Sequence, residues 1–408
     1  MIKAIQPCTR ESEKDNGAEP MMNLVIKTEW YSLLMCIFSI PMFESPKSIF
    51  LVVAILMFLI RHYIDQDIRK TLFTADSRLG FLALALAAVI SAAFAQRPGL
   101  AIQGSLDILK MFFLFAVVAT DFSDERSVRI IALWVIISTA IASIWGLVEY
   151  AVIKKTFLEL HSVGHSNHSS IYLALAMWVA VCYFFAAETG LAKWTALLSS
   201  MLILAALLFT ASRATFLAFI VSAACLVALS GLSRKKLLYA AMAAGSSILI
   251  AWIMFRDVAF NFLNKGIGFQ SLFNRVDIWN MAWEVIKQHP IVGVGAKHFQ
   301  LQDPVVYGVI VTEKLSHAHN LFLNILVQYG IIGLFALLFL FYLVGKGLRP
   351  ATGNFMRPAA FASLIIVIVN GLLNTTMHSE HGLLFALIIG IGLTAAQPCV
   401  QQTMRPGI

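Results

Sequence analysis

About twelve apolar runs divide the sequence, and most are long enough for a helix to cross a lipid bilayer. Because the bilayer core holds no water, a crossing segment must satisfy its own backbone hydrogen bonds, so such runs fold as helices. By run length they fall near residues 28–43, 49–60, 79–95, 105–120, 130–153, 170–188, 194–211, 215–232, 237–255, 320–346, 358–374 and 382–398. Hydrophobic residues make up 59% of the chain and charged residues 13%, which is too apolar for a soluble globular fold. The sequence therefore predicts an all-α, polytopic integral membrane protein.

The distribution of Lys and Arg predicts the orientation in the membrane. Basic residues concentrate in alternate loops, which the positive-inside rule places in the cytoplasm. The short loops outside then contain few of them: Lys47, Arg97, Lys154, Lys155 and Arg213. We expect the following segments: cytoplasmic tails at 1–27 and 399–408, nine transmembrane helices in 28–255, a large external loop with amphipathic helices at 256–318, and three transmembrane helices in 319–398. All histidines except His62 fall outside or at the outer boundary, which indicates a site on the outer face.

The stretch 313–333 (EKLSHAHNLFLNILVQYGIIG) begins with two histidines and continues into an apolar run. We expect a helix over residues 318–346, about 43 Å long against a hydrocarbon core of about 30 Å. His319 would then stand about 12 Å outside the core, at the depth of lipid head groups. Three amides repeat at helical spacing below it: Asn320, Asn324 and Gln328. Amides in an apolar helix usually face protein or a wet cavity, so this stretch is where we expect the chemistry.

Residues 274–290 (NRVDIWNMAWEVIKQHP) indicate an amphipathic helix that ends at Pro290. Its expected apolar face consists of Ile278, Trp279, Ala282, Trp283 and Ile286. Paired tryptophans suit a membrane interface. Arg275 falls in the expected first turn, where a cation opposes the helix dipole unless it shares an anion with the helix amides. The alternative is an arginine that reaches out to lipid head groups.

Three further groups are polar residues in or beside apolar runs. Arg213 lies in a tight turn (TASRAT), either as a lipid anchor or as a rigid clamp for an anion. The loop 161–170 (HSVGHSNHSS) adds His165, Asn167 and His168. No acidic or cysteine residue accompanies these histidines, so we expect no metal site. Asp107 and Lys110, one turn apart, predict a structural ion pair.

Three motifs resemble those of bacterial O-antigen ligases. His319-Asn320 is followed by nine residues, Gly330, two residues and Gly333. The other two motifs are the Ser212-Arg213 turn and the run Arg275…Trp279…Pro290…Gly293-Val-Gly295. The layout of about twelve spans, with the largest external loop before the tenth, is similar too. The resemblance implies a GT-C-like glycosyltransferase that moves a polysaccharide from undecaprenyl diphosphate to a sugar hydroxyl of lipid A–core, with inversion and without metal or cofactor.

The resemblance also implies residue roles. His319 is expected to be the general base, kept neutral by the positive end of the helix that it begins; the alternative is that it only hydrogen-bonds the sugar or phosphate. Arg213 and Arg275 are expected to bind the diphosphate and to neutralise its charge as the glycosidic bond breaks. Residues expected to position the substrates are His317, Asn320, Asn324, His165, Asn167 and His168. The expected partners are undecaprenyl-diphosphate-linked O-antigen, lipid A–core oligosaccharide and membrane lipids, with no nucleotide and no nucleic acid. The expected location is the bacterial inner membrane, with a periplasmic active site.

Two alternatives remain from the sequence. An O-antigen polymerase, or a ligase that glycosylates protein, would carry similar motifs. A twelve-helix transporter is the alternative from another class. Against it, the segment between the sixth and seventh expected spans (189–193) is very short, and acidic residues within spans, the usual coupling-ion sites, are scarce.

Overall fold

The computed structural model describes residues 19–64, 76–122, 124–188, 190–229, 267–307, 317–348 and 354–394. The long elements in these ranges are α1 (Glu19–Ser39), α2 (Glu44–Ile64), α4 (Asp76–Phe94), α5 (Pro98–Asp121), α6 (Glu125–Ile153), α7 (Ser166–Ala186), α8 (Gly190–Phe209), α9 (Arg213–Leu229), α12 (Ile267–Gln288), α13 (Leu321–Gly347), α14 (Arg357–Gly371) and α15 (Ser379–Leu393). Two short 3-10 helices follow α12: η2 (Phe299–Leu301) and η3 (Pro304–Tyr307). The described ranges contain no β-strand, so the expected all-α class is confirmed.

Most of these helices have the length and composition of membrane spans. Seven helices in the described ranges qualify by both measures: α2, α4, α5, α6, α7, α8 and α13. Three shorter helices are also apolar: α9, α14 and α15. This pattern confirms a polytopic membrane protein. The span expected at 237–255 lies outside the described residues.

The first two helices differ from their expected limits. α1 begins at Glu19 instead of residue 28, and α2 covers 44–64 instead of 49–60. Lys47, which we expected in an external loop, therefore lies in the first turn of α2, where it is buried and forms an ion pair with Glu380 of α15. Apolar run length missed the ends of α2 because Lys47 and Arg61 there are paired with Glu380 of α15 and with Glu29 and Asp121.

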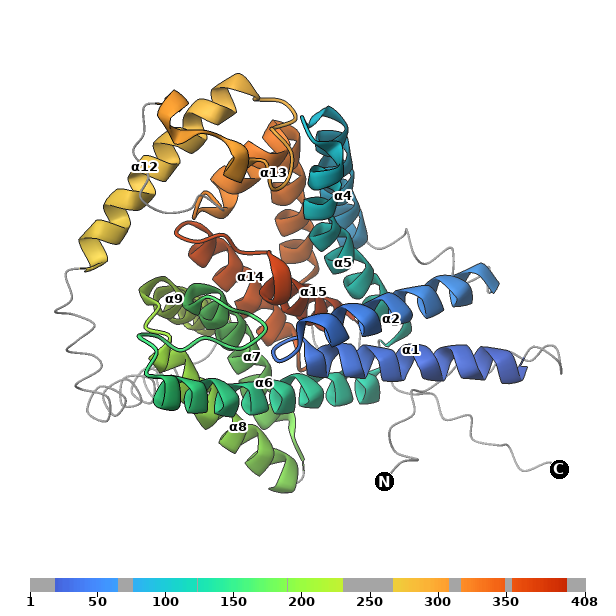
Figure 1. Cartoon of the computed structure of the whole chain (residues 1–408). Helices are drawn as coiled ribbons and strands as arrows, with labels where there is room; N and C mark the ends of the chain where they lie inside the picture. The colour runs from blue at the N-terminus through green and yellow to red at the C-terminus, as the bar shows by residue number, and fades with distance from the viewer. Residues whose placement is uncertain are drawn as a thin grey trace, which may run out of the picture.

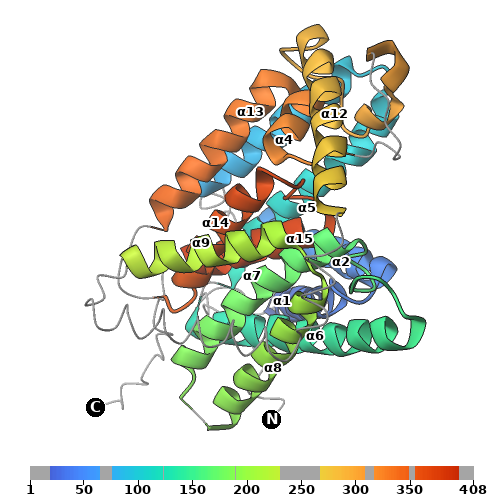
Figure 2. The ribbon, with the colours of Figure 1, turned by 90° about the vertical axis from the view of Figure 1, so that its left-hand side faces the viewer.

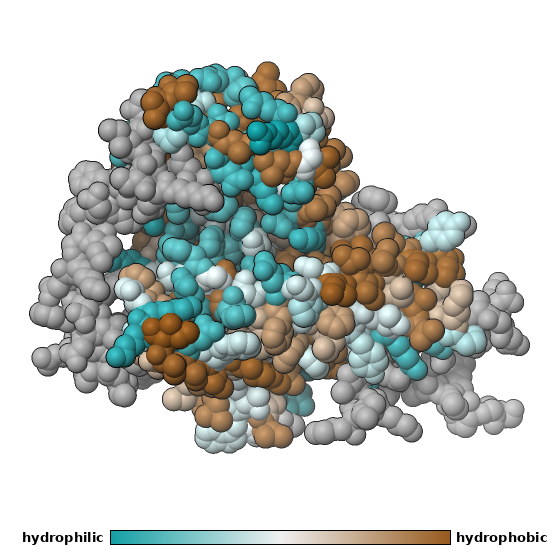
Figure 3. Space-filling view, viewed as in Figure 1, coloured by the Kyte–Doolittle hydropathy of each residue, from teal (hydrophilic) through white to brown (hydrophobic). Residues whose placement is uncertain are grey.

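α15 is the central helix of the bundle. Its residues are buried on every side, as expected for a helix without a polar face, and it packs against α5, α7 and α14. Figures 1 and 2 show α4 and α13 side by side, next to α5, while α1, α2 and α6 pack together at another edge. In Figure 3, hydrophobic residues cover much of α1, α2 and α8, whereas hydrophilic residues gather between α12 and the central helices. The hydrophilic region between α12 and the central helices is therefore where a substrate site could lie.

α12 and the start of α13 share a small core of their own. Its members are Ile278, Met281, Ala282, Val285, Ile286, Val294, Phe299, Ala318 and Val327. The amphipathic helix expected at 274–290 is therefore present, but it is longer and its buried face differs. Trp283, which we placed on the apolar face, is 51% exposed, and Met281 and Val285 are buried instead. Packing against α13 buries the stripe that contains Met281 and Val285 and leaves Trp283, in the same turns of the helix, exposed.

α13 is broken at Gly330, whose φ of 63° and ψ of −162° interrupt the helix. Residues 290–295 (PIVGVG), which we call the splint, lie against this break. Four backbone hydrogen bonds join the two: Val294 N–H to Val327 C=O, Gly295 N–H to Gln328 C=O, Ile331 N–H to Pro290 C=O and Ile332 N–H to Ile291 C=O. A Cβ at Gly330 would lie 2.1 Å from the carbonyl oxygen of Ile291. The splint thus supplies the hydrogen-bond partners that the broken helix lacks.

The break changes the geometry expected for His319. The continuous helix that we predicted from residue 318 is wrong, because α13 begins at Leu321 and bends at Gly330. The part after the break, Ile331 to Gly347, is about 25 Å long, close to the thickness of a hydrocarbon core. The part before it packs with α12. The segment that carries His319 therefore belongs to the small core that α12 shares with the start of α13.

Candidate active site

Several chain segments meet at one end of α15, in a region that we call the polar junction. These are the N-terminal ends of α7, α9 and α15, the end of α14, the loop 317–320 and the middle of α12. Hydrogen bonds that link them are Asn320 Nδ2 to Leu372 C=O (2.9 Å), Arg275 Nη2 to Asn374 Oδ1 (3.5 Å), Asn370 Nδ2 to Thr215 Oγ1 (2.7 Å) and Ser212 Oγ to Asn167 Oδ1 (3.2 Å). The structure therefore brings together the separate stretches that the sequence singled out.

Histidine rings pack together at the centre of the polar junction. The cluster consists of His165, His168, His317, His378 and His381. Ring centroids are 5.0 Å apart for His168 and His381, 4.7 Å for His317 and His378, and 6.4 Å for His168 and His317. The buried Nδ1 atoms of His168 and His317 have no hydrogen-bond partner. Buried polar atoms are usually paired, so the cluster has hydrogen-bonding capacity left for a bound molecule.

His319 lies beside this cluster in a partly buried position. Burial lowers its pKa to about 4, and electrostatic interactions, of which that with Arg275 is the largest, add to this effect. Burial also lowers the pKa of His317, and it lowers the pKa of His378 to about 3, with help from His317. Near neutral pH these imidazoles are therefore uncharged. A neutral imidazole can accept a proton, as a general base must.

The two asparagines of this segment have different environments. We expected Asn320 in a helical stripe, but it is the N-cap of α13. Its side chain accepts hydrogen bonds from the backbone N–H groups of Phe322 and Leu323. Asn324 is buried, accepts from the backbone N–H of Ala318 at 3.3 Å and contacts Gln328 at 3.4 Å. Asn320 thus orients the start of the helix, and Asn324 holds the backbone next to His319.

Arg275 is partly buried, and its guanidinium reaches the end of α14. We expected it in the first turn of a helix, but α12 begins at Ile267, so Arg275 lies about two turns inside the helix. The conflict that we expected between Arg275 and the positive end of the helix is therefore absent. Its place beside Asn374 and its electrostatic effect on His319 nevertheless put a fixed positive charge at the polar junction. Such a charge can bind an anion.

Arg213 begins α9, in the tight turn that the sequence predicted. Its side chain is exposed, and the neighbouring residues are tied to the rest of the site. Thr215 contacts Ser170 at 2.6 Å and Ser212 at 3.1 Å, and it accepts from Asn370. Asn374 in turn donates to Asn370 at 2.6 Å. A chain of hydrogen bonds thus connects the turn that carries Arg213 with the contact made by Arg275.

Backbone strain concentrates around the polar junction. Non-glycine residues with positive φ in the described ranges are Lys154, Ala211, Lys297, His319, Met377 and Ser379. All except Lys154 flank the site, and each such conformation costs about 1–2 kcal/mol. His319 itself has φ of 47°. Strain of this kind persists where surrounding contacts fix the backbone, and it is common at functional sites.

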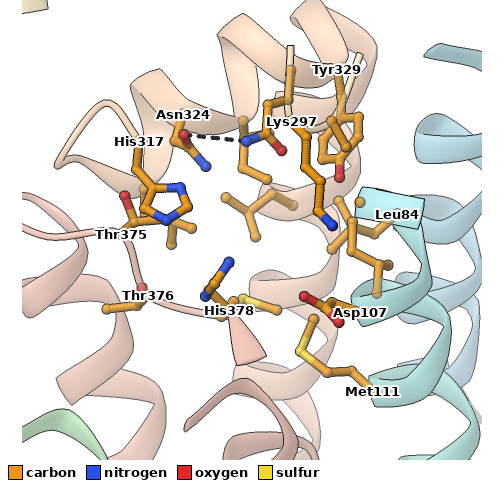
Figure 4. Close-up of a pocket in the computed structure, with 18 of the residues that line it drawn as sticks. Leu84, Asp107, Met111, Lys297, His317, Asn324, Tyr329, Thr375, Thr376 and His378 are labelled. Atoms are coloured by element: carbon orange, nitrogen blue, oxygen red, sulfur yellow. Dashed lines mark hydrogen bonds between the residues drawn. The ribbon is translucent and has the colours of Figure 1, made fainter. Parts of the chain in front are cut away.

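A cavity of about 350 Å³ opens beside the histidine cluster, between α5, α13 and the segment before α15. Figure 4 shows His317, Asn324 and Lys297 on one side of it and His378, Asp107 and Met111 on the other. Asp107 forms the expected ion pair with Lys110 at 3.3 Å. Arg213, Arg275 and His319 are not among the lining residues. The cavity therefore adjoins the predicted catalytic residues through His317 and His378.

The histidine cluster has no acidic partner in the part of the chain that the structure describes. No three His, Cys, Asp or Glu side chains there are arranged to hold a metal ion. Glu380, the acidic residue within the motif of His378 and His381, is paired with Lys47. Neither of these histidines, nor Asn370 or Asn374, is among the site residues expected from the sequence. The two asparagines could have been predicted, because they are amides one turn apart in an apolar run, the same pattern that singled out Asn324 and Gln328.

Fold and site define a polytopic membrane protein with a histidine- and arginine-containing site where its helix ends meet. Residues 198–338 match the family model described as O-Antigen ligase. The chain is also 26% identical over 293 residues to "Exopolysaccharide production protein ExoQ" of Rhizobium meliloti (strain 1021), an alignment that covers 66% of this chain and 65%, just under two thirds, of that relative. These matches confirm the resemblance to the O-antigen ligase/polymerase superfamily. The family match includes Arg213, Arg275 and His319.

Proposed function

We propose that this protein is an O-antigen ligase, a glycosyltransferase that moves a polysaccharide from undecaprenyl diphosphate to a sugar hydroxyl of lipid A–core. The reaction takes place on the periplasmic face of the bacterial inner membrane. The observation that carries this proposal is that Arg275 and the segment of His319 both bind the end of α14: Arg275 donates to Asn374, and Asn320 donates to the carbonyl of Leu372. A base and an anion site close together are the two groups that glycosyl transfer from a diphosphate requires.

Each residue has a distinct part in the proposed reaction. The acceptor oxygen forms a bond to the anomeric carbon while the bond from that carbon to the diphosphate breaks. His319 takes the hydroxyl proton, and the diphosphate leaves with the bonding electron pair. Arg275 and Arg213 neutralise the charge that develops on the leaving group, an interaction that is strong where water is excluded. His165, His168 and His317 offer hydrogen bonds to sugar or phosphate oxygens, and Asn167 and Asn324 hold the adjoining backbone and side chains.

A second candidate is a polymerase that joins carrier-linked repeat units. The observation in its favour is the match to a relative whose name refers to exopolysaccharide production. The two reactions need the same anion site and the same base, because they differ only in the acceptor. The identity of the acceptor therefore decides between them.

A deletion strain tests the proposal directly. If the protein is a ligase, full-length polysaccharide accumulates on the carrier lipid and lipid A–core stays bare; single repeats attached to the core indicate a polymerase. Complementation with His319→Gln should lower turnover by about 10²–10⁴, the usual contribution of a general base, while donor binding persists. Parental turnover by this variant would show that His319 only binds substrate and that the base lies elsewhere.

A further inference from the structure

The cavity beside the histidine cluster has a composition that the proposed diphosphate site does not explain. Its polar groups come from five segments: Asp107 of α5, Lys297 and Gln300 near η2, His317 before α13, Asn324 and Gln328 of α13, and Thr375 with His378 before α15. Its apolar walls include Leu84, Ile108, Met111 and Ile325. A sugar ring has hydroxyls around its edge and C–H groups on its faces, so a cavity with convergent polar groups and an apolar wall suits it.

We propose that this cavity binds the end of the acceptor glycan, with Asp107, Thr375 and His317 hydrogen-bonded to its hydroxyls. The inference rests on the proposed glycosyl transfer, and it identifies the acceptor side of that site. A volume of about 350 Å³ is at the lower end for a ligand pocket. The cavity therefore takes the terminal part of a glycan and leaves the remainder outside.

Unpaired polar atoms on the wall support a polar ligand. Thr375 is 3% exposed, yet its Oγ1 has no hydrogen-bond partner, and neither has Nδ1 of His317. Both residues line the cavity, and Figure 4 shows the hydroxyl of Thr375 beside the ring of His317. The neighbouring Thr376 also lines the cavity, but its hydroxyl already has a partner, because it donates to the carbonyl of Val367 at 3.0 Å. An unpaired buried hydroxyl is unfavourable, and a sugar hydroxyl would pair it.

The position of the cavity suits the acceptor better than the donor. Arg275 donates to Asn374 at the end of α14, so the diphosphate belongs on that side of the histidine cluster. The cavity borders His317 and His378 but neither of the two arginines. An inverting transfer requires the hydroxyl to approach the anomeric carbon from the side opposite the leaving diphosphate. The attacking oxygen would then come from the cavity, and its proton would pass to His319.

Two neighbouring threonines provide a matched test. The probe is delipidated core oligosaccharide, titrated by NMR or thermophoresis against the purified full-length protein in detergent. Thr375→Val should weaken binding about tenfold, the effect of one lost hydrogen bond in a buried site, without lowering the thermal unfolding midpoint. Thr376→Val should instead lower the midpoint and keep the affinity. Unchanged affinity in Thr375→Val, or equal losses in both variants, would overturn the proposal.

The Asp107–Lys110 ion pair allows a second test, since Lys110 does not line the cavity. Asp107→Asn keeps the shape and removes the charge, and it should raise KM for the acceptor about tenfold while KM for the donor stays unchanged. Lys110→Met breaks the same ion pair and should leave the acceptor KM unchanged. If both substitutions have the same effect, Asp107 acts only through its ion pair, and the inference is wrong.

The choice of oligosaccharide separates this inference from the proposed function. Repeat-unit oligosaccharide, released from the carrier lipid, is titrated in parallel with core oligosaccharide. Tighter binding of the core supports the ligase, whereas tighter binding of the repeat unit, weakened by Thr375→Val, supports a polymerase that uses the same cavity. If neither glycan binds the parent protein, the cavity assignment fails even where transfer is observed. If glycan binds as predicted but no transfer occurs, the proposed reaction fails and the cavity assignment stands.

Discussion

The pKa of His319 predicts an unusual pH dependence of the reaction. Burial and the charge of Arg275 lower this pKa from 6.5 to about 4. As the proposed base, His319 is active when neutral, so kcat/KM falls as the pH drops through the pKa of His319 in the free protein. With a pKa of 6.5, kcat/KM would fall about 25-fold between pH 7 and pH 5; with a pKa of about 4 it falls by only about 10%.

Substitution of Arg275 tests the electrostatic part of this argument. Arg275→Gln removes the nearby charge, so the pKa of His319 rises and the acid side of the profile moves to higher pH. Because burial is the larger cause, the profile should still fall at a pH below 6.5. The variant should also lose the proposed charged contact to the diphosphate, which lowers the rate about 100-fold. The assay therefore needs a radiolabelled donor to follow the residual activity.

The assay measures kcat/KM at half-unit steps from about pH 3.5 to pH 8, with a matched His289→Gln control at an exposed histidine outside the site. The lowered pKa values also reduce stability as the pH falls from about 6.5 toward about 4, because the unfolded chain then binds more protons than the folded one. Folded protein is therefore quantified at each pH. An acid limb near pH 6.5 in the parent, or a limb that Arg275→Gln leaves in place, would refute the reasoning.

Further predictions concern the arginines, the break in α13, metals and topology. Arg213→Ala and Arg275→Ala should each lose most of the activity, and Lys should restore it only in part, because it lacks the planar fork; full activity at normal abundance would make that residue a lipid anchor. Gly330→Ala should destabilise the protein by at least about 2 kcal/mol, from its positive φ and the contact with the splint, whereas Gly99→Ala, with open space around it, should not, as thermal unfolding will show. Turnover should persist in EDTA, and a loss restored by one divalent ion would place a metal in the histidine cluster. A cysteine at Gln302 should react with an impermeant reagent in intact cells; labelling only after lysis would reverse the expected orientation.

The sequence predicted most where a residue's chemistry alone limits its environment, as for long apolar runs and for isolated polar residues within or beside them. Apolar run length predicted the helical membrane fold, and the isolated polar residues Arg213, Arg275 and His319 were found to surround one junction. These inferences needed no knowledge of packing partners. They depend on the cost of placing a polar group in an apolar run.

Features that depend on a distant partner could not be predicted in this way. The start of α13 follows from the cap made by Asn320, and the buried face of α12 follows from its contact with α13. His378 and His381 entered the site because α15 is the central helix, which periodicity does not reveal. The cavity likewise requires α5 beside α13, a neighbour relation that no local pattern encodes.

The splint has a consequence for how this chain can change in evolution. Residues 290–295 and the break at Gly330 are distant in sequence, but they interlock so closely that a methyl group on Gly330 would collide with Ile291. Substitutions in the two stretches are therefore coupled. A side chain at Gly293 or at Gly330 requires the backbone of the opposite stretch to move. The number of residues between them is under no such constraint. Among relatives, the intervening segment should vary in length while these two glycines are kept or lost together.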